Sequence, residues 1–193
     1  MSREKQFDEA HVLQQAIRVF WARGYEGTSM NDLVEAMGIN RGSIYATYTN
    51  KHRLFMTALR YYDRTFRKEF FNSVERRHAP KQAIVALFDE ASRQYGTVEE
   101  PGGCMIVNSA LELSPHDPEV RALADACFQE VEDFFASRID AAQREGTIAA
   151  ELDAGKTARA LLCLFLGLRV LTRSTPHRAT LGAITSQAKA MLE

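Results

Sequence analysis

Two short segments that each begin with a helix-capping residue are separated by only Gly38 and Ile39. Ser29 and Asp32 have the spacing of a capping box at the start of the first segment. Gly38 can adopt the left-handed conformation that ends this helix, and Asn40 is a good N-cap for the next one. Because the connection is so short, the second helix must turn sharply away from the first. The sequence therefore predicts a helix-turn-helix.

The second helix of this pair, residues 41–48, has one apolar side. Ile44 and Tyr48 are four residues apart and are expected to face the preceding helices. The outer side is expected to carry small, polar and basic residues: Arg41, Gly42, Ser43, Tyr45, Ala46 and Thr47. A surface of this kind suits the major groove of DNA, which admits a helix whose side chains are short or can bond to base edges.

Each outer residue has an expected role in DNA binding. Arg41 can read a guanine with two hydrogen bonds or contact a phosphate. Ser43 and Thr47 can contact base edges or phosphates, while Ala46 and the Thr47 methyl group can meet thymine methyls. Gly42 permits close approach of the backbone.

Residues around this helix are expected to hold phosphates and so fix its register. They are Thr28 near the start of the first helix of the pair, the hydroxyl of Tyr45, and Lys51. Packing is the alternative role of Tyr45. Arg3 and Lys5 on the N-terminal arm would add salt-sensitive attraction that does not depend on DNA sequence.

The charge distribution agrees with a basic N-terminal half. Residues 1–77 carry 13 Lys and Arg against 9 Asp and Glu, although the formal net charge of the 193-residue chain is -1. Residues 78–193 therefore carry a negative net charge. With 46% hydrophobic residues the chain can bury a substantial core, in one or two domains.

Helical periodicity continues on both sides of this motif. Before it, apolar residues fall on one face of a helix expected to end near Gly24: Leu13, Ala16, Ile17, Phe20 and Trp21. After it, a helix starting at Asn50 is expected to place these residues inward: Leu54, Phe55, Ala58, Leu59, Tyr62 and Phe66. Its basic residues are assigned to an ordinary solvated face: Arg60, Arg64, Arg67 and Lys68.

The rest of the chain also shows only helical signals, so an all-α fold is predicted. Pro80 can open a helix that runs to Tyr95, and further helices are expected after Cys104, after Pro118, over residues 154–173 and over residues 181–192. The segment ARALLCLFLGLRVL is apolar on nearly every side. It is expected to be covered by its own core and by a second subunit. Cys127 and Cys163 are predicted to be core residues.

At these motifs the sequence resembles the TetR family of bacterial transcriptional regulators. The resemblance runs through GYEGTS (24–29), GINRGSIY (38–45) and Y-x-NK-x-x-L (48–54). It implies an N-terminal DNA-binding head (residues 1–50), a connecting helix (51–78) and a C-terminal ligand-binding and dimerisation domain (79–193). It also implies a homodimer on double-stranded DNA with a pseudo-palindromic operator, and a repressor that responds to a small-molecule effector.

The chain departs from the family pattern in the recognition helix. Members commonly have histidine or another aromatic residue where this chain has Ala46 and Thr47, and phenylalanine at the position of Tyr48. The operator sequence of a relative therefore does not carry over.

The segment Gly102–Asn108 is the candidate regulatory site. Cys104 stands at an expected helix start, where the positive end of the helix dipole favours the thiolate. The segment resembles that of a TetR subgroup that includes repressors sensing electrophiles and oxidants through this cysteine, although a cysteine can also serve as a small buried hydrophobe. More generally, a small apolar or aromatic effector is expected near four residues: Phe88, Tyr95, Asn108 and Phe128.

Other classes of function have less support. A cysteine-dependent enzyme could use Cys104 with His116 and Glu112, but no base or oxyanion site is evident from their spacing. Cys104, His116 and Cys127 match no zinc pattern, so neither a metal nor a cofactor is expected. A helical dimerisation module without DNA binding remains the alternative. No signal peptide or membrane span is evident, and a cytoplasmic protein is expected.

Overall fold

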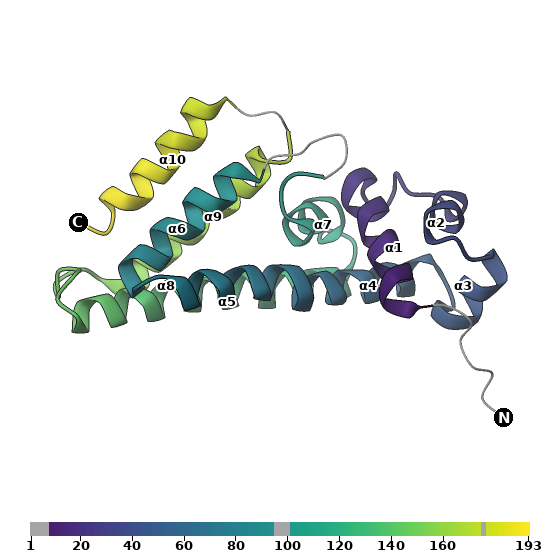
Figure 1. Cartoon of the computed structure of the whole chain (residues 1–193), viewed down its shortest axis with the longest axis horizontal. Helices are drawn as coiled ribbons and strands as arrows, with labels where there is room; N and C mark the ends of the chain where they lie inside the picture. The colour runs from purple at the N-terminus through teal and green to yellow at the C-terminus, as the bar shows by residue number, and fades with distance from the viewer. Residues whose placement is uncertain (1–7, 95–100, 175–176) are drawn as a thin grey trace.

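The computed structural model describes residues 8–94, 101–174 and 177–193, and every regular element in these ranges is a helix (Figure 1). The prediction of an all-α fold is confirmed. The helices are α1 (Glu9–Arg23), α2 (Met30–Met37), α3 (Arg41–Tyr48), α4 (Lys51–Tyr62), η1 (Asp63–Arg67), α5 (Lys68–Arg77), α6 (Pro80–Arg93), α7 (Met105–Leu113), α8 (Pro118–Arg144), α9 (Ala154–Leu171) and α10 (Arg178–Ala190). None of these helices is long and apolar enough to cross a membrane.

The helix-turn-helix forms as its capping residues predict. Ser29 accepts a hydrogen bond from Asp32 N, and the Asp32 carboxylate accepts one from Ser29 N at 2.8 Å. Gly38 ends α2 in the left-handed conformation, with φ 64°. Asn40 Oδ1 accepts from Ser43 N at 2.8 Å and starts α3. These local bonds satisfy the backbone groups that helix ends leave free, so the sharp turn is stable.

The long helix that leaves the head contains one π-helical turn, η1, between α4 and α5. A π-turn inserts one extra residue, which rotates the following side chains by about 100°. Asp63 and Arg67 are consequently buried, each 9% exposed, and Phe66 is 43% exposed. The predictions that Phe66 faces inward and that Arg67 lies on a solvated face are therefore wrong.

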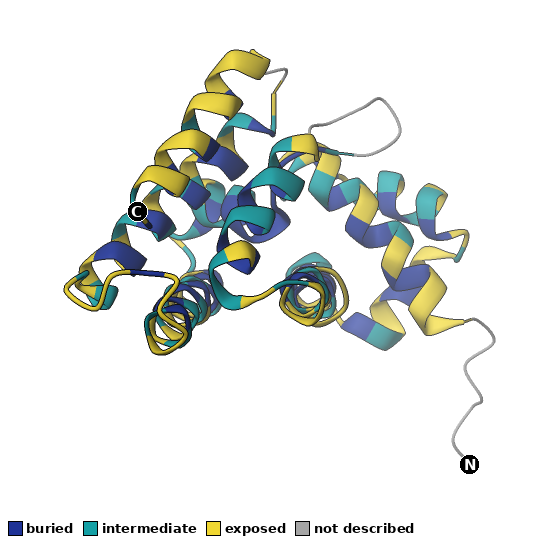
Figure 2. Ribbon diagram, turned by 60° about the vertical axis from the view of Figure 1, so that its left-hand side comes forward, coloured by how far each residue is buried: buried dark blue, intermediate teal, exposed yellow. Residues whose placement is uncertain are grey.

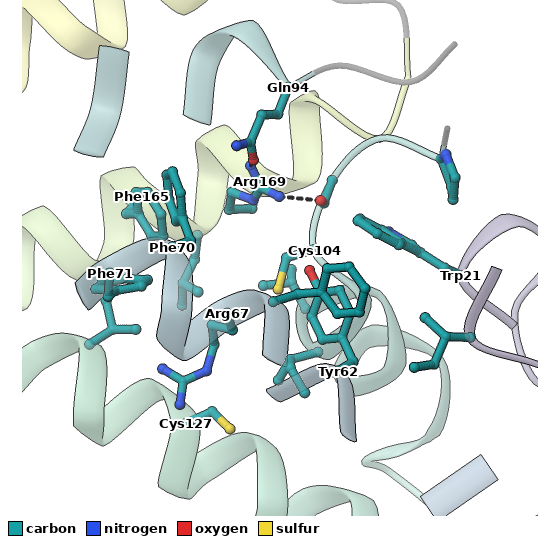
Figure 3. A pocket seen from close by; sticks show the side chains of 18 of the residues that line it. Trp21, Tyr62, Arg67, Phe70, Phe71, Gln94, Cys104, Cys127, Phe165 and Arg169 are labelled. Atoms are coloured by element: carbon teal, nitrogen blue, oxygen red, sulfur yellow. Dashed lines mark hydrogen bonds between the residues drawn. The ribbon is translucent and has the colours of Figure 1, made fainter. Parts of the chain in front are cut away.

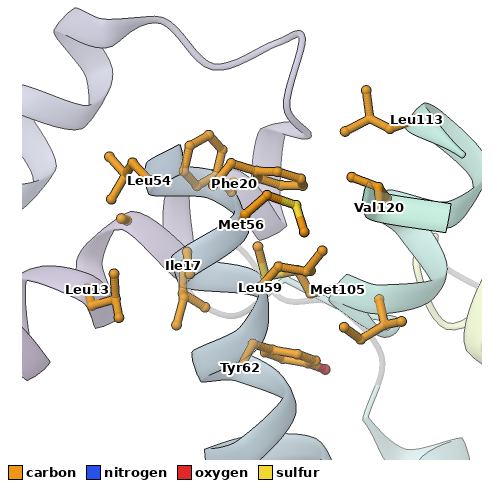
Figure 4. Packing of buried hydrophobic residues seen from close by; sticks show 14 of the residues in the cluster. Leu13, Ile17, Phe20, Leu54, Met56, Leu59, Tyr62, Met105, Leu113 and Val120 are labelled. Carbon is orange, nitrogen blue, oxygen red and sulfur yellow. The ribbon is translucent and has the colours of Figure 1, made fainter. Parts of the chain in front are cut away.

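Buried apolar residues form two clusters. The first includes Ile17 and Phe20 of the head and Leu59 of α4, and it continues into Met105 of α7 and Val120 of α8 (Figure 4). The second joins α5, α6, α8, α9 and α10. The packing of the head therefore continues directly into α7 and the start of α8.

Helix α9 buries one side and exposes the other. Leu161, Phe165 and Leu168 face the core, whereas Val170 is 41% exposed and Cys163 is also exposed. The prediction that Cys163 is a core residue is wrong for the protomer, but Cys127 is buried as predicted. Along α10 the outer side is exposed as well (Figure 2). These two helices thus present a partly apolar face to solvent.

Candidate DNA-binding surface and effector cavity

Helix α3 presents the outer residues that the sequence indicated. Ile44 and Tyr48 are buried, at 0% and 5% exposure. Burial raises the pKa of Tyr48 to about 12. The opposite side carries four exposed residues, Arg41, Gly42, Tyr45 and Ala46, and two half-buried ones, Ser43 and Thr47. Tyr45 is 43% exposed, so its hydroxyl is accessible to a phosphate.

The Arg41 side chain rests on α2. Its Nη2 donates to Asn31 Oδ1 at 2.7 Å, and both residues are exposed. Asn31 therefore joins the DNA-facing surface, which we define as Asn31 together with the outer residues of α3. Sequence patterns do not indicate this role of Asn31, because nothing in a ten-residue spacing shows that the side chains of Asn31 and Arg41 meet.

Two predicted phosphate-binding residues are engaged within the protein. Thr28 is 1% exposed, and its hydroxyl donates to Gly24 O at 2.6 Å. The Thr28 side chain is thus a structural bond in the loop between α1 and α2, which corrects its predicted role. Lys51 lies over the ring of Tyr25, with Nζ 4.2 Å from the centroid. Arg3 and Lys5 lie outside the described residues.

The C-terminal end of α1 is bonded to the helices of the other half of the chain. Trp21 Nε1 donates to Gly102 O at 3.1 Å. The Arg173 guanidinium, just beyond α9, donates to the carbonyls of Trp21 and Ala22, the latter at 2.9 Å. These bonds satisfy carbonyls at the end of α1, where a cation is also favoured by the helix dipole.

A second set of bonds connects α4 to α8. His52 Nε2 lies 2.7 Å from Asp117 Oδ2, and Arg60 Nη2 donates to Glu119 Oε1 at 3.0 Å. Asp117 also caps α8 by accepting from Glu119 N and Val120 N. Burial raises the pKa of Asp117, but the bonds from Val120 N and His52 outweigh it and keep this pKa below its usual value.

A cavity of about 690 Å³ lies between the head and the C-terminal helices (Figure 3). This volume is within the range typical of small-molecule sites. Ile17 and Trp21 line it from the head, and Phe128 and Phe165 line it from α8 and α9. The π-turn contributes Phe66 and Arg67. Seven of the lining residues are aromatic.

The predicted effector residues divide among three environments. Cys104 and Phe128 line the cavity. Phe88 is 0% exposed in the second core cluster, packed on Phe135, so its predicted place at an effector site is corrected. Asn108 is not among the cavity-lining residues, and its buried Nδ2 has no hydrogen-bond partner among the described residues. Tyr95 lies outside the described part of the chain.

Cys104 is the N-cap of α7 and is 8% exposed on the cavity wall. The hydroxyl of Tyr62 lies beside its thiol (Figure 3). Burial, followed by the proximity of Cys104, raises the pKa of Tyr62 well above its usual value. A molecule that enters the cavity therefore meets a thiol and a neutral phenol side by side.

The second cavity cysteine is held in its thiol form. Cys127 Sγ donates to Asp63 Oδ1 at 3.4 Å. Burial raises the pKa of Cys127 to about 12, with Asp63 adding to the effect and Arg67 opposing it. Because the thiolate is the nucleophile, Cys127 is chemically inert near neutral pH.

The residues of the hypothetical cysteine enzyme are not assembled. Cys104 precedes α7 and His116 follows it, so they are separated by the roughly 13 Å length of the helix. Glu112 is occupied by backbone N–H groups of the head, at 3.0 Å from Tyr25 N and 2.8 Å from Glu26 N. Within the described ranges, no group of three His, Cys, Asp or Glu residues could hold a metal ion.

Both halves of this chain match known protein families. Residues 12–57 match the model of bacterial regulatory proteins of the tetR family, and residues 80–186 match the tetracyclin repressor-like C-terminal domain. An uncharacterized HTH-type transcriptional regulator of Bacillus subtilis, YezE, is 36% identical over 176 residues, 91% of each chain. The HTH-type transcriptional repressor ComR of Escherichia coli is 30% identical over 89% of this chain and 82% of its own length.

The solved structures agree with the sequence relatives. A TetR family transcriptional regulator, CifR, solved as a cysteine mutant with 26-base-pair operator DNA, superimposes with a TM-score of 0.85 at 30% identity. The match covers 97% of this chain and 98% of the CifR chain. Two domain models, full-length relatives and a shared architecture therefore agree: this chain belongs to the TetR family of DNA-binding transcriptional regulators.

Proposed function

We propose that the protein is a dimeric repressor that leaves its operator when a small molecule occupies the cavity. One observation carries the proposal: Ile17 and Trp21 of α1 and Phe128 and Phe165 of the C-terminal helices line the same cavity. A molecule bound there contacts the DNA-binding head directly. It can shift the head only if it binds the released arrangement more tightly than the DNA-bound one.

The exposed face of α9 and α10 supports the dimer. Val170 and Cys163 lie on it, and such a surface is stabilised by a second copy of the chain. Two recognition helices related by a two-fold axis would enter half-sites about 34–36 Å apart or at a multiple of this spacing. The operator is accordingly a pseudo-palindrome. In this proposal the protein acts in the cytoplasm by binding DNA and has no catalytic role.

A second route to release runs through Cys104, because its thiol lines the cavity. An electrophile with an activated carbon–carbon double bond would form a carbon–sulfur bond as its π bond breaks, and the thiol proton would end, by way of solvent, on the neighbouring carbon. The bulk added beside Tyr62 would then act on the cavity wall as a bound effector does. Replacing Cys104 with Ser would abolish this route and leave reversible effectors active.

Fluorescence anisotropy on DNA from upstream of the protein's own gene tests the proposal. The expected result is saturable, sequence-selective binding whose affinity falls with salt, because bound phosphates release counterions. An effector must weaken operator binding by the same factor by which operator weakens effector binding. Absence of binding to any DNA at low salt would instead favour a helical dimerisation module without DNA binding.

A further inference from the structure

Four arginines line the cavity among the described residues, and no Asp or Glu does. Arg18 and Arg93 are exposed, and Arg67 and Arg169 are buried. A guanidinium stays protonated in proteins, so each contributes a full positive charge. The cavity therefore combines an aromatic wall with cationic groups.

The two buried arginines differ in their partners. Arg67 is neutralised within the protein, because it donates to Asp63 at 2.5 Å and also to Glu130. Arg169 is 6% exposed, and no carboxylate among the described residues pairs with it. Within the described ranges its guanidinium donates to neutral acceptors, Gln94 Oε1 at 3.1 Å and the carbonyl of Gly103 (Figure 3).

Burying a charged group without a counter-charge is energetically costly. The C-terminal end of α9 and two neutral oxygens offset part of this cost for Arg169. The guanidinium has five N–H donors, and the two acceptors found among the described residues do not use all of them, so others can bind a ligand. On the same wall, Cys104 and the hydroxyl of Tyr62 make this the polar corner of the cavity.

We propose that the effector is an organic anion, a carboxylate on an aromatic body, whose charge pairs with Arg169. The aromatic side chains of Trp21, Phe128 and Phe165 would enclose the body. Arg18 and Arg93, exposed on the same cavity, would attract the anion from solution. This inference rests on the proposed effector role of the cavity, but anion binding can be measured without DNA.

The test compares two fluorescent probes that differ in one charge. 8-Anilinonaphthalene-1-sulfonate is an anion, and N-phenyl-1-naphthylamine is the same body without the sulfonate. Trp21 is the single tryptophan of the chain and lines the cavity, so energy transfer from it reports binding at this site. The measured quantity is the ratio of the two dissociation constants in the wild type and in Arg169→Gln.

The charge of Arg169 should strengthen binding of the anionic probe and leave binding of the neutral probe unchanged. We expect Arg169→Gln to reduce the preference for the anionic probe by about tenfold or more, as for a hydrogen bond between charged groups. Arg169→Lys should restore much of the preference. Arg144→Gln is the matched control, because it removes an equal charge from an exposed position outside the cavity lining. An unchanged ratio in Arg169→Gln would overturn the proposal.

The wild-type protein supplies a second readout that does not depend on folding of a variant. 2-Naphthoate should displace the anionic probe about tenfold better than 2-naphthamide, its neutral analogue. Equal displacement by the two compounds would also overturn the proposal. If the naphthoate binds but does not release operator DNA, the anion site stands and the effector role of the cavity fails.

Discussion

The carboxylate of Glu112 on α7 accepts a hydrogen bond from the backbone N–H of Tyr25 at 3.0 Å. It also accepts one from Glu26 N at 2.8 Å. A side chain of the C-terminal half thus holds the loop that leads into the helix-turn-helix. Glu112 thereby links α7, whose N-cap is the cavity residue Cys104, to the DNA-binding head.

Removal of this carboxylate should loosen the head. Glu112→Ala leaves two N–H groups without their charged acceptor, and we expect a loss of about 1–3 kcal/mol in the free energy of unfolding, measured in urea. Glu151→Ala, at an exposed position, is the control and should change stability little. Equal stability of the two variants would contradict a structural role for Glu112.

Gly103 is predicted to tolerate no side chain. Its φ is 77°, and an added Cβ would lie 2.9 Å from the backbone oxygen of Arg169. Gly146 has a similar φ of 70° but nothing within 4 Å of its Cβ position. Gly146→Ala should therefore cost only the strain of the left-handed backbone, about 1 kcal/mol, and Gly103→Ala clearly more. Thermal unfolding of both variants measures the difference.

The DNA-facing surface is tested by two substitutions with different expected signatures. Arg41→Ala should weaken operator binding by about 1–3 kcal/mol and relax specificity at one base pair if the guanidinium reads a guanine. Lys51→Ala should weaken binding to all sequences and reduce the salt slope by about one. Arg144→Ala, an exposed residue at the far end of α8, is the control. Unaltered DNA binding in both variants would contradict the prediction that this surface binds DNA.

The dimer face is tested on α9. Val170→Asp places a charge on an exposed apolar position, and we expect the dissociation constant of the dimer to rise by at least about tenfold. Analytical ultracentrifugation measures this shift. Leu111→Asp changes another exposed apolar residue, 66% exposed on α7, and should leave the dimer intact. A dimer unaffected by Val170→Asp would place the interface elsewhere.

Stability should fall at alkaline pH, partly through Cys127. The folded protein raises the pKa of this thiol to about 12, whereas its ordinary value is 9.0. The folded state thus holds the proton more tightly, so its contribution to stability is complete below pH 9 and is lost as the pH rises from 9 toward 12. Unfolding of Cys127→Ala in urea at several pH values should show a shallower decline. An identical decline would exclude a contribution from Cys127.

The helix-turn-helix could be predicted because its signals are local. Ser29, Asp32, Gly38 and Asn40 each act on backbone groups within a few residues, so their spacing alone places α2 and α3. Ile44 and Tyr48 followed from helical periodicity in the same way. The candidate recognition residues on the outer side of α3 were found for this reason.

Periodicity failed where the backbone changed its period. The π-turn at Asp63–Arg67 left Phe66 43% exposed on the cavity wall and buried Arg67. No residue spacing in the sequence indicates this turn. It is consistent with the ion pairs that Arg67 forms with Asp63 and with Glu130, the latter on α8. A helix assumed to be regular therefore assigns both side chains to the wrong face.

The sequence by itself determined the helices, their caps and the exposed side of α3, because each depends on neighbours within one or two turns. Only the tertiary structure decided that Phe88 belongs to the core, that Glu112 holds the head, and that Arg169 reaches the cavity. These roles depend on contacts between helices far apart in the chain. Such contacts are set by the packing of whole helix faces, which local spacing does not encode.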